Sequence, residues 1–147
     1  MNTVKDILDQ KGKNVWSVGP QDTLLDALKM FRAHGIGSLL VIEQGNIKGI
    51  ITERDFAWQI ADKGLCPLNQ PVSMWMTSDV IVVSPDMSIN ECMQLMSREH
   101  VRHLPVVDRG KLSGMISIGD VVKAVISGQQ STILGLENYI LSQKFAL

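Results

Sequence analysis

Short apolar stretches alternate with amphipathic segments along this chain, and the whole alternation occurs twice. Each round begins with a brief β-branched stretch that ends at Pro20 or Pro85. An amphipathic segment follows whose apolar residues recur every three or four positions, the spacing of a helix that buries one face. Two short apolar runs joined by a polar, glycine-containing turn then predict a hairpin. A second helix starts directly after it, so the pattern predicts the order β-α-β-β-α in each round.

The predicted elements occupy equivalent places in the two rounds. The first round has strands at 14–18, 39–43 and 47–52 and a helix at 23–34; the second has strands at 80–83, 104–108 and 112–117 and a helix at 88–100. Thr23 and Ser88 each precede an acidic residue by three positions, which is the spacing of a helix-capping box. Residues 4–10 and 134–143 are predicted as short amphipathic helices at the two ends.

The two rounds are copies of one unit. A shift of 65 residues aligns 18–57 with 83–122 without a gap, and eight of the 40 positions are identical. Because only two copies exist, we expect a pseudo-twofold pair rather than a solenoid. The predicted fold class is α/β, with two βαββα units packed through their sheets. The predicted boundaries are a first unit with its N-terminal helix at 1–64, a linker at 65–73, a second unit at 74–128 and a C-terminal helix at 129–147.

Composition narrows the possible partners. The net charge is −1 over 147 residues, so no general basic field is available to hold nucleic acid or an anionic membrane. No segment has the length and apolar character of a membrane span or of a signal peptide. The chain's two cysteines, Cys66 and Cys92, match no metal-binding or redox spacing. We therefore expect a cytoplasmic protein without nucleic-acid or membrane partners.

The start of the last helix in each copy carries the most informative motif. The first copy reads Gly49-Ile50-Ile51-Thr52-Glu53-Arg54-Asp55 and the second reads Gly114-Met115-Ile116-Ser117-Ile118-Gly119-Asp120. One interpretation is an ordinary capping box, in which the hydroxyl and the carboxylate satisfy free helix N–H groups. The other is a nucleotide site, since a helix N-terminus attracts phosphate and a carboxylate can accept the two hydrogen bonds of a ribose diol.

These doubled motifs, together with Arg102-His103-Leu104-Pro105-Val106-Val107-Asp108, resemble the CBS-domain tandem pair, also called a Bateman module. The resemblance covers about 4–128 and needs both copies at matched positions. It implies that the chain binds AMP, ADP, ATP, NAD(H) or S-adenosylmethionine between its units and regulates a partner protein without catalysing a reaction. A homodimer is the assembly that we expect, because one pair leaves apolar helix faces to cover.

The resemblance also implies which residues hold the nucleotide. At one site Asp120 would hold the ribose, with Ser117, Ile118 and Gly119 beside it, Arg102, His103 and Lys11 toward the phosphates, and Met115, Val15, Trp16, Ser17, Ile36 and Gly37 around the base. The twin site would use Asp55, Thr52 and Arg54, with Ile50, Val80, Ile81 and Val101 lining the base. Gly37 and Ser38 stand where the other copy has Arg102 and His103. The Asp120 site is therefore predicted to bind more tightly, with Arg102 able to serve both.

Other chemistries remain as alternatives. His100 and His103 have the spacing of helical metal ligands, but no further ligand type lies nearby in sequence, and zinc sites need three or four ligands. Ser117, His103 and Asp120 include the residue types of a hydrolase triad without a nucleophile elbow. A non-catalytic dimeric scaffold with vestigial clefts is the main alternative to a nucleotide sensor.

Overall fold

The computed structural model describes residues 2–144. Contacts divide the chain into two units. The first, here called the repeat-one unit, is Asn14–Ile81, and the second, the repeat-two unit, joins Met1–Lys13 to Val82–Leu147. The N-terminal segment, predicted from the sequence as part of the first unit, thus makes its contacts with the second repeat.

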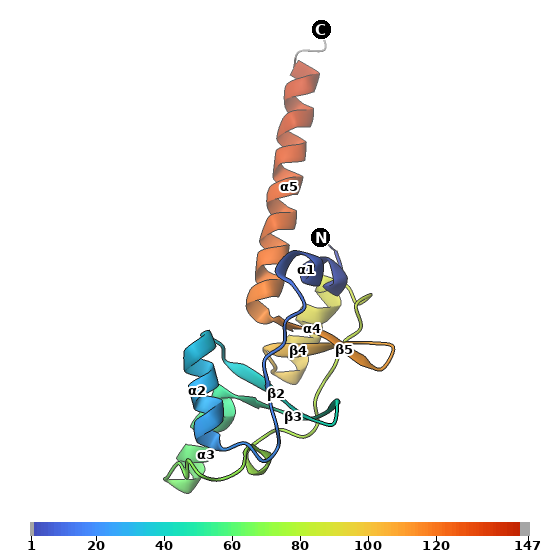
Figure 1. The fold of residues 1–147 in the computed structure, drawn as a ribbon. Helices are drawn as coiled ribbons and strands as arrows, with labels where there is room; N and C mark the ends of the chain where they lie inside the picture. The colour runs from blue at the N-terminus through green and yellow to red at the C-terminus, as the bar shows by residue number, and fades with distance from the viewer. Residues whose placement is uncertain (1, 145–147) are drawn as a thin grey trace. The chain divides into compact units, whose positions relative to one another are not determined.

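The repeat-one unit is a three-stranded sheet with helices packed on it (Figure 1). Its elements are β1 (Ser17–Val18), α2 (Leu24–His34), β2 (Ser38–Glu43), β3 (Asn46–Thr52), α3 (Glu53–Lys63) and the short 3₁₀ helix η1 (Val72–Met74). β2 pairs antiparallel with β3, and β1 adds to it in parallel. The core includes Leu24, Leu39 and Ile51, and also Val72 from the predicted linker and Trp75 from the start of the predicted second unit.

The repeat-two unit has the same hairpin with a reduced first strand. Its elements are α1 (Val4–Lys11), α4 (Ile89–Glu99), β4 (His103–Asp108), β5 (Lys111–Ser117) and α5 (Ile118–Lys144). The strand predicted at 80–83 is only a single parallel bridge between Val83 and Val106. In repeat one, Leu40 N donates to Trp16 O at 3.3 Å. The equivalent donor in repeat two is Pro105, which has no N–H, so the parallel ladder cannot extend.

The C-terminal helix differs from the prediction of a separate short element. α5 runs without interruption from Ile118 to Lys144, a length of 27 residues. Gly128 and Gly135 lie within it; an interior glycine costs about 1 kcal/mol relative to alanine but keeps its hydrogen bond, so the helix continues. Among residues 2–144, no helix combines the length and apolar character required to cross a membrane.

Each repeat has a covering segment that bonds to the residues around the start of its first helix, residues 70–76 in repeat one and 2–8 in repeat two. The two segments make the same backbone hydrogen bonds at a shift of 68 residues: Val72 N to Asp22 O (2.7 Å) matches Val4 N to Met87 O (2.9 Å), and Leu24 N to Gln70 O (2.9 Å) matches Ile89 N to Asn2 O (3.0 Å). One covering segment follows its repeat in sequence and the other precedes it. This arrangement brings the end of α1 to the start of α5 and thereby shapes the Asp120 site.

Candidate functional site

Asp120 lies in the first turn of α5, which begins directly after strand β5 ends at Ser117. Its Oδ2 accepts hydrogen bonds from Ser117 N at 2.8 Å and Ser117 Oγ at 3.0 Å. Asp120 N donates in return to Ser117 Oγ at 3.3 Å. These are the reciprocal bonds of a capping box. Asp120 therefore does cap the helix, and its carboxylate must have a further free acceptor if it is also to bind a ligand.

Lys11, at the end of α1, is a further partner of this carboxylate. Its Nζ donates to Asp120 Oδ2 at 2.8 Å and to Met115 O at 2.9 Å. Within residues 2–144, all the hydrogen bonds recorded on the Asp120 carboxylate end on Oδ2. The other oxygen, Oδ1, is thus available to accept a hydroxyl from outside the chain. Sequence reasoning had placed Lys11 near the phosphates but missed its direct contact with Asp120.

The electrostatic balance keeps this carboxyl ionised. Burial raises the pKa of Asp120, but the hydrogen bond from Lys11, the hydrogen bond from the Ser117 backbone and the positive charge of Lys11 outweigh it. The pKa of Asp120 therefore lies below its ordinary value of 3.8. An ionised carboxylate is the better acceptor for sugar hydroxyls, because charge-assisted hydrogen bonds are the stronger ones.

The ion pair should contribute to stability only where Asp120 is charged. Lys11→Met is expected to lower the free energy of unfolding by about 0.5 kcal/mol near neutral pH, since partly exposed pairs are weak. The lowered pKa makes this contribution present above the unfolded-state pKa and lost as pH falls through the folded-state pKa. Urea unfolding of both proteins between about pH 7 and pH 3 measures the difference. A deficit that stays constant over this range would contradict the assignment.

A pocket adjoins the carboxylate on the side of α1. It has a volume of about 410 Å³ and is lined by residues of α1 and the first three turns of α5, namely Ile7, Gln10, Lys11, Asp120, Lys123, Ala124, Ile126 and Ser127. Small-molecule sites generally have volumes of roughly 300–1,000 Å³ and combine apolar walls with a few polar groups. Lys123, one helical turn beyond Asp120, adds a second cation that the sequence reasoning did not include. The pocket suits a ligand with hydroxyls and negative charge.

The equivalent carboxylate of repeat one has a different partner. Asp55 Oδ2 accepts from Thr52 N at 2.9 Å and Thr52 Oγ1 at 3.2 Å, again as a capping box. Its Oδ1 accepts from Thr77 Oγ1 at 3.2 Å. The Asp55 cluster therefore has the Thr77 hydroxyl in place of a lysine, and both carboxylate oxygens already have partners.

The residues that precede the hairpins take matching positions. Gly37 O accepts from Glu53 N at 3.1 Å, and Arg102 O accepts from Ile118 N at 2.8 Å. His103 pairs with Ser117 across the β4–β5 ladder, so the two side chains share a face of the sheet. The hairpin thus places the backbone of Arg102 and His103 beside the start of α5, and their contact with phosphate stays a prediction.

Trp16 is exposed and already stacked. Its ring lies 3.5 Å from the His34 ring, centroid to centroid, at an interplanar angle of 14°. One face of the indole is therefore covered by a residue that sequence reasoning did not include. The predicted base-lining residues belong to both units, with Val15, Ser17, Ile36, Ile50, Val80 and Ile81 in repeat one and Met115 and Val101 in repeat two. Their role around one base stays a prediction.

Comparison with known proteins is consistent with this doubled arrangement. The family model described as CBS domain matches twice, over residues 4–62 and 72–127. The chain belongs to the CBS-domain family. As a tandem CBS pair it matches the CBS domain-containing protein YhcV of Bacillus subtilis, at 32% identity over 89% of this chain and 91% of that one. Among residues 2–144 no cluster of three or more His, Cys, Asp or Glu side chains is arranged to hold a metal ion.

Two solved structures are similar over most of the CBS pair. A putative signal-transduction protein with CBS domains from Burkholderia ambifaria is 44% identical, with a TM-score of 0.82 over 86% of this chain and 96% of that one. The CBS domain pair of protein MJ0100, solved with 5′-methylthioadenosine and S-adenosyl-L-methionine, is 26% identical, with a TM-score of 0.73 over 86% of this chain and 97% of that one. CBS pairs are regulatory ligand-binding modules, and the MJ0100 pair is one that was solved with adenosine-containing ligands.

Proposed function

We propose that this CBS pair is a sensor of an adenosine-containing nucleotide whose ribose is held by Asp120, and that it signals as a homodimer to a partner protein. The observation that supports the proposal most directly is the Asp120 carboxylate, ionised, with Oδ1 open beside a pocket that holds two lysines. AMP, ADP, ATP and NAD(H) are the candidate ligands, since each combines a ribose diol with phosphate.

The binding step follows from the contacts of Asp120. One ribose hydroxyl would donate to the open Oδ1, and the second would replace Lys11 on Oδ2. Lys11 would then turn its ammonium toward the phosphate, where Lys123 adds a second positive charge. Arg102 and His103 would contribute from the hairpin side. Ligand binding would thus replace the Lys11–Asp120 ion pair by one between Lys11 and the ligand's phosphate. Because Lys11 ends α1, occupancy of the site is linked to the position of that helix.

Calorimetry on the purified apo protein tests the proposal. We expect AMP, ATP or NADH to bind with a dissociation constant in the micromolar range, about −8 kcal/mol, which is ordinary for a reversible sensor. Absence of binding by all of these and by S-adenosylmethionine would favour a dimeric scaffold with vestigial clefts. Conversion of a bound nucleotide during prolonged incubation would instead indicate an enzyme.

Lys11 should discriminate among ligands by charge. Lys11→Met is expected to weaken ATP binding about tenfold, because one charge-assisted contact to phosphate contributes about 1.4 kcal/mol. Binding of S-adenosylmethionine, which carries no phosphate, should stay unchanged or tighten, because Asp120 Oδ2 no longer has to release a lysine. Lys5→Met, an exposed change on the same helix, is the control. Equal losses for both ligands would contradict the exchange of partners.

A further inference from the structure

The second half of α5 presents large apolar side chains to solvent. From Gly128 to Gln143 every residue is exposed. Four of them, Ile133, Leu136, Tyr139 and Ile140, follow one another at helical spacing and are 55–62% exposed; we call them the α5 stripe. Leu134 and Leu141 point away from the stripe, as do Ser131, Asn138 and Ser142, because each lies about 100° or more round the helix from both Leu136 and Ile140. Single exposed leucines are common, but a continuous apolar strip marks a contact surface.

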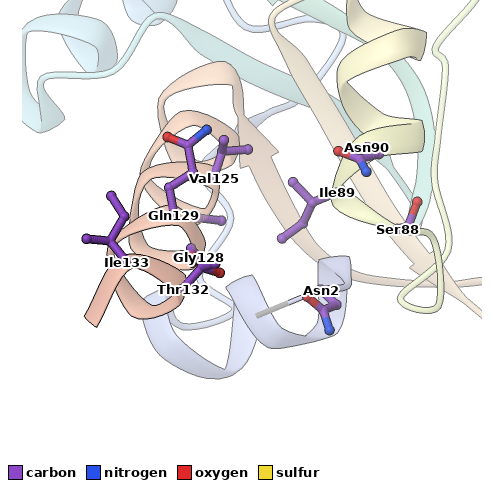
Figure 2. A pocket seen from close by; sticks show the side chains of 10 residues that line it. Asn2, Ser88, Ile89, Asn90, Val125, Gly128, Gln129, Thr132 and Ile133 are labelled. Atoms are coloured by element: carbon purple, nitrogen blue, oxygen red, sulfur yellow. Dashed lines mark hydrogen bonds between the residues drawn. The ribbon is translucent and has the colours of Figure 1, made fainter. Parts of the chain in front are cut away.

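A groove runs along the first half of the same helix. Its volume is about 640 Å³, and it lies between α5, the start of α4 and the N-terminal segment (Figure 2). Val125, Gln129 and Ile133 line it from α5, and Ile89 and Asn90 line it from α4. None of the lining residues within 2–144 is charged. Gly128 also lies in its wall, and a Cβ there would meet no atom within 4 Å, so a second helix can approach closely.

The stripe and the groove wall are consecutive parts of one helix and share Ile133. We propose that the groove of one copy receives the α5 stripe of a second copy, with the two α5 helices antiparallel. In a twofold interface each contact is made twice, so the stripe of each copy must reach the groove of the other. Only antiparallel helices satisfy this requirement, with a centre between Leu134 and Gly135. Ile133 then faces Leu136 of the second copy, and Gln129 faces Ile140. The inference rests on the proposed homodimer and names its surface.

The area of the stripe and groove is compatible with a small dimer interface. The four stripe side chains expose roughly 400 Å² per copy, taking about 100 Å² for each. With the groove walls, the two copies together bury in total about the 1,000 Å² that a specific interface should exceed. A membrane is a poorer occupant, because interfacial helices rely on basic residues. From 124 to 144, α5 contains one acidic and one basic residue, Glu137 and Lys144.

Disulfide trapping in the full-length protein tests the antiparallel pairing. In a Cys66→Ser background, Gln129→Cys and Ile140→Cys proteins are oxidised separately and then as a mixture; the remaining Cys92 is buried. We expect a covalent dimer in the mixture and little in either protein alone. The positions lie 11 residues apart, about 16 Å along a helix, so neither can reach its own copy in the antiparallel form. Replacing Ile140→Cys by Ser142→Cys, on the opposite side, should abolish trapping.

Sedimentation provides the second measurement. Ile140→Glu should weaken dimerisation at least about tenfold without changing the thermal midpoint of the monomer, whereas Ser142→Glu, with the same charge on the opposite side, should not. Self-trapping of each single cysteine would indicate parallel helices and overturn the inference. A dimer that the cysteine pair does not trap and that Ile140→Glu does not weaken would overturn the α5 surface, while the proposal of a homodimer would stand. A wild-type monomer at tens of micromolar, whether or not it binds phosphatidylcholine–phosphatidylglycerol vesicles, would overturn both, while nucleotide calorimetry reports on the sensor separately.

Discussion

Asp120→Ala is expected to lower the affinity for the adenine nucleotide by at least about thirtyfold, and Asp55→Ala by less than about threefold. Each hydrogen bond from a hydroxyl to a charged carboxylate contributes about 1.5–3 kcal/mol, so loss of the ribose acceptor is costly. Asp120 has an open Oδ1 and two lysines nearby. Asp55 has both oxygens bonded within its own unit, to Thr52 and Thr77. Calorimetry with the ligand that binds wild type most tightly measures both variants.

The control for this comparison is the shared capping role. Both aspartates close a capping box, so both variants should lose a similar ~1 kcal/mol of stability. A similar fall in unfolding free energy with very different affinities would separate the two roles. Equal losses of affinity would refute the difference between the sites. A larger loss for Asp55→Ala would show that the repeat-one carboxylate holds the ribose instead.

Gly49→Ala is expected to destabilise the protein by about 3 kcal/mol, against about 1 kcal/mol for Gly114→Ala. The two glycines are equivalent in the repeats, and each lies beneath a covering segment. A Cβ at Gly49 would lie 2.6 Å from Met76 Sδ and 2.8 Å from Thr77 O. Thr77 cannot retreat easily, because it exchanges two backbone hydrogen bonds with Ile50, at 2.8 and 2.9 Å.

The Gly114 position has a more adaptable neighbour. The three atoms nearest to a Cβ there all belong to the Leu8 side chain, with Cδ2 at 2.7 Å. A leucine can change rotamer, so the strain is partly relieved. Urea unfolding of the two variants measures the difference directly. Equal destabilisation would show that the Thr77 backbone moves as readily as the Leu8 side chain. Leu8→Ala by itself should cost about 2–5 kcal/mol, because Leu8 is buried. Combined with Gly114→Ala, the loss should be smaller than the sum of the two single losses, because the shortened side chain removes the clash.

Most of the local structure could be predicted because its signals are local. The hairpins follow from short apolar runs on either side of Gln44-Gly45 and Arg109-Gly110, and Gln44 and Arg109 adopt the positive φ that such turns require. The helix starts follow from hydroxyl and acidic residues three positions apart. The strand at 80–83 was harder to predict, because the missing donor is Pro105, on a different strand.

The candidate site was only half predictable. Two of its residues stand out because the other copy has a matching residue 65 positions earlier, namely Asp120 and Ser117. The Arg102–His103 pair stands out because the other copy has Gly37 and Ser38 at those positions. The contact of Lys11 with Asp120 could not be predicted from the 65-residue repeat. The covering segments repeat at a shift of 68 instead, and one precedes its repeat in sequence while the other follows it. The stack of His34 on Trp16 was missed for a similar reason, because the helix and the strand meet only in the folded unit.

The sequence by itself determined the duplicated βαββα order, the capped helix starts and the two acidic candidates, because each depends on residues within a few positions of one another. The tertiary structure alone decided which acid acquires a cation. Lys11 and Asp120 are 109 residues apart, and only the packing of α1 on the second repeat brings them together. The corresponding position of repeat one received Thr77, so two nearly identical motifs have different partners and different capacities to bind a nucleotide.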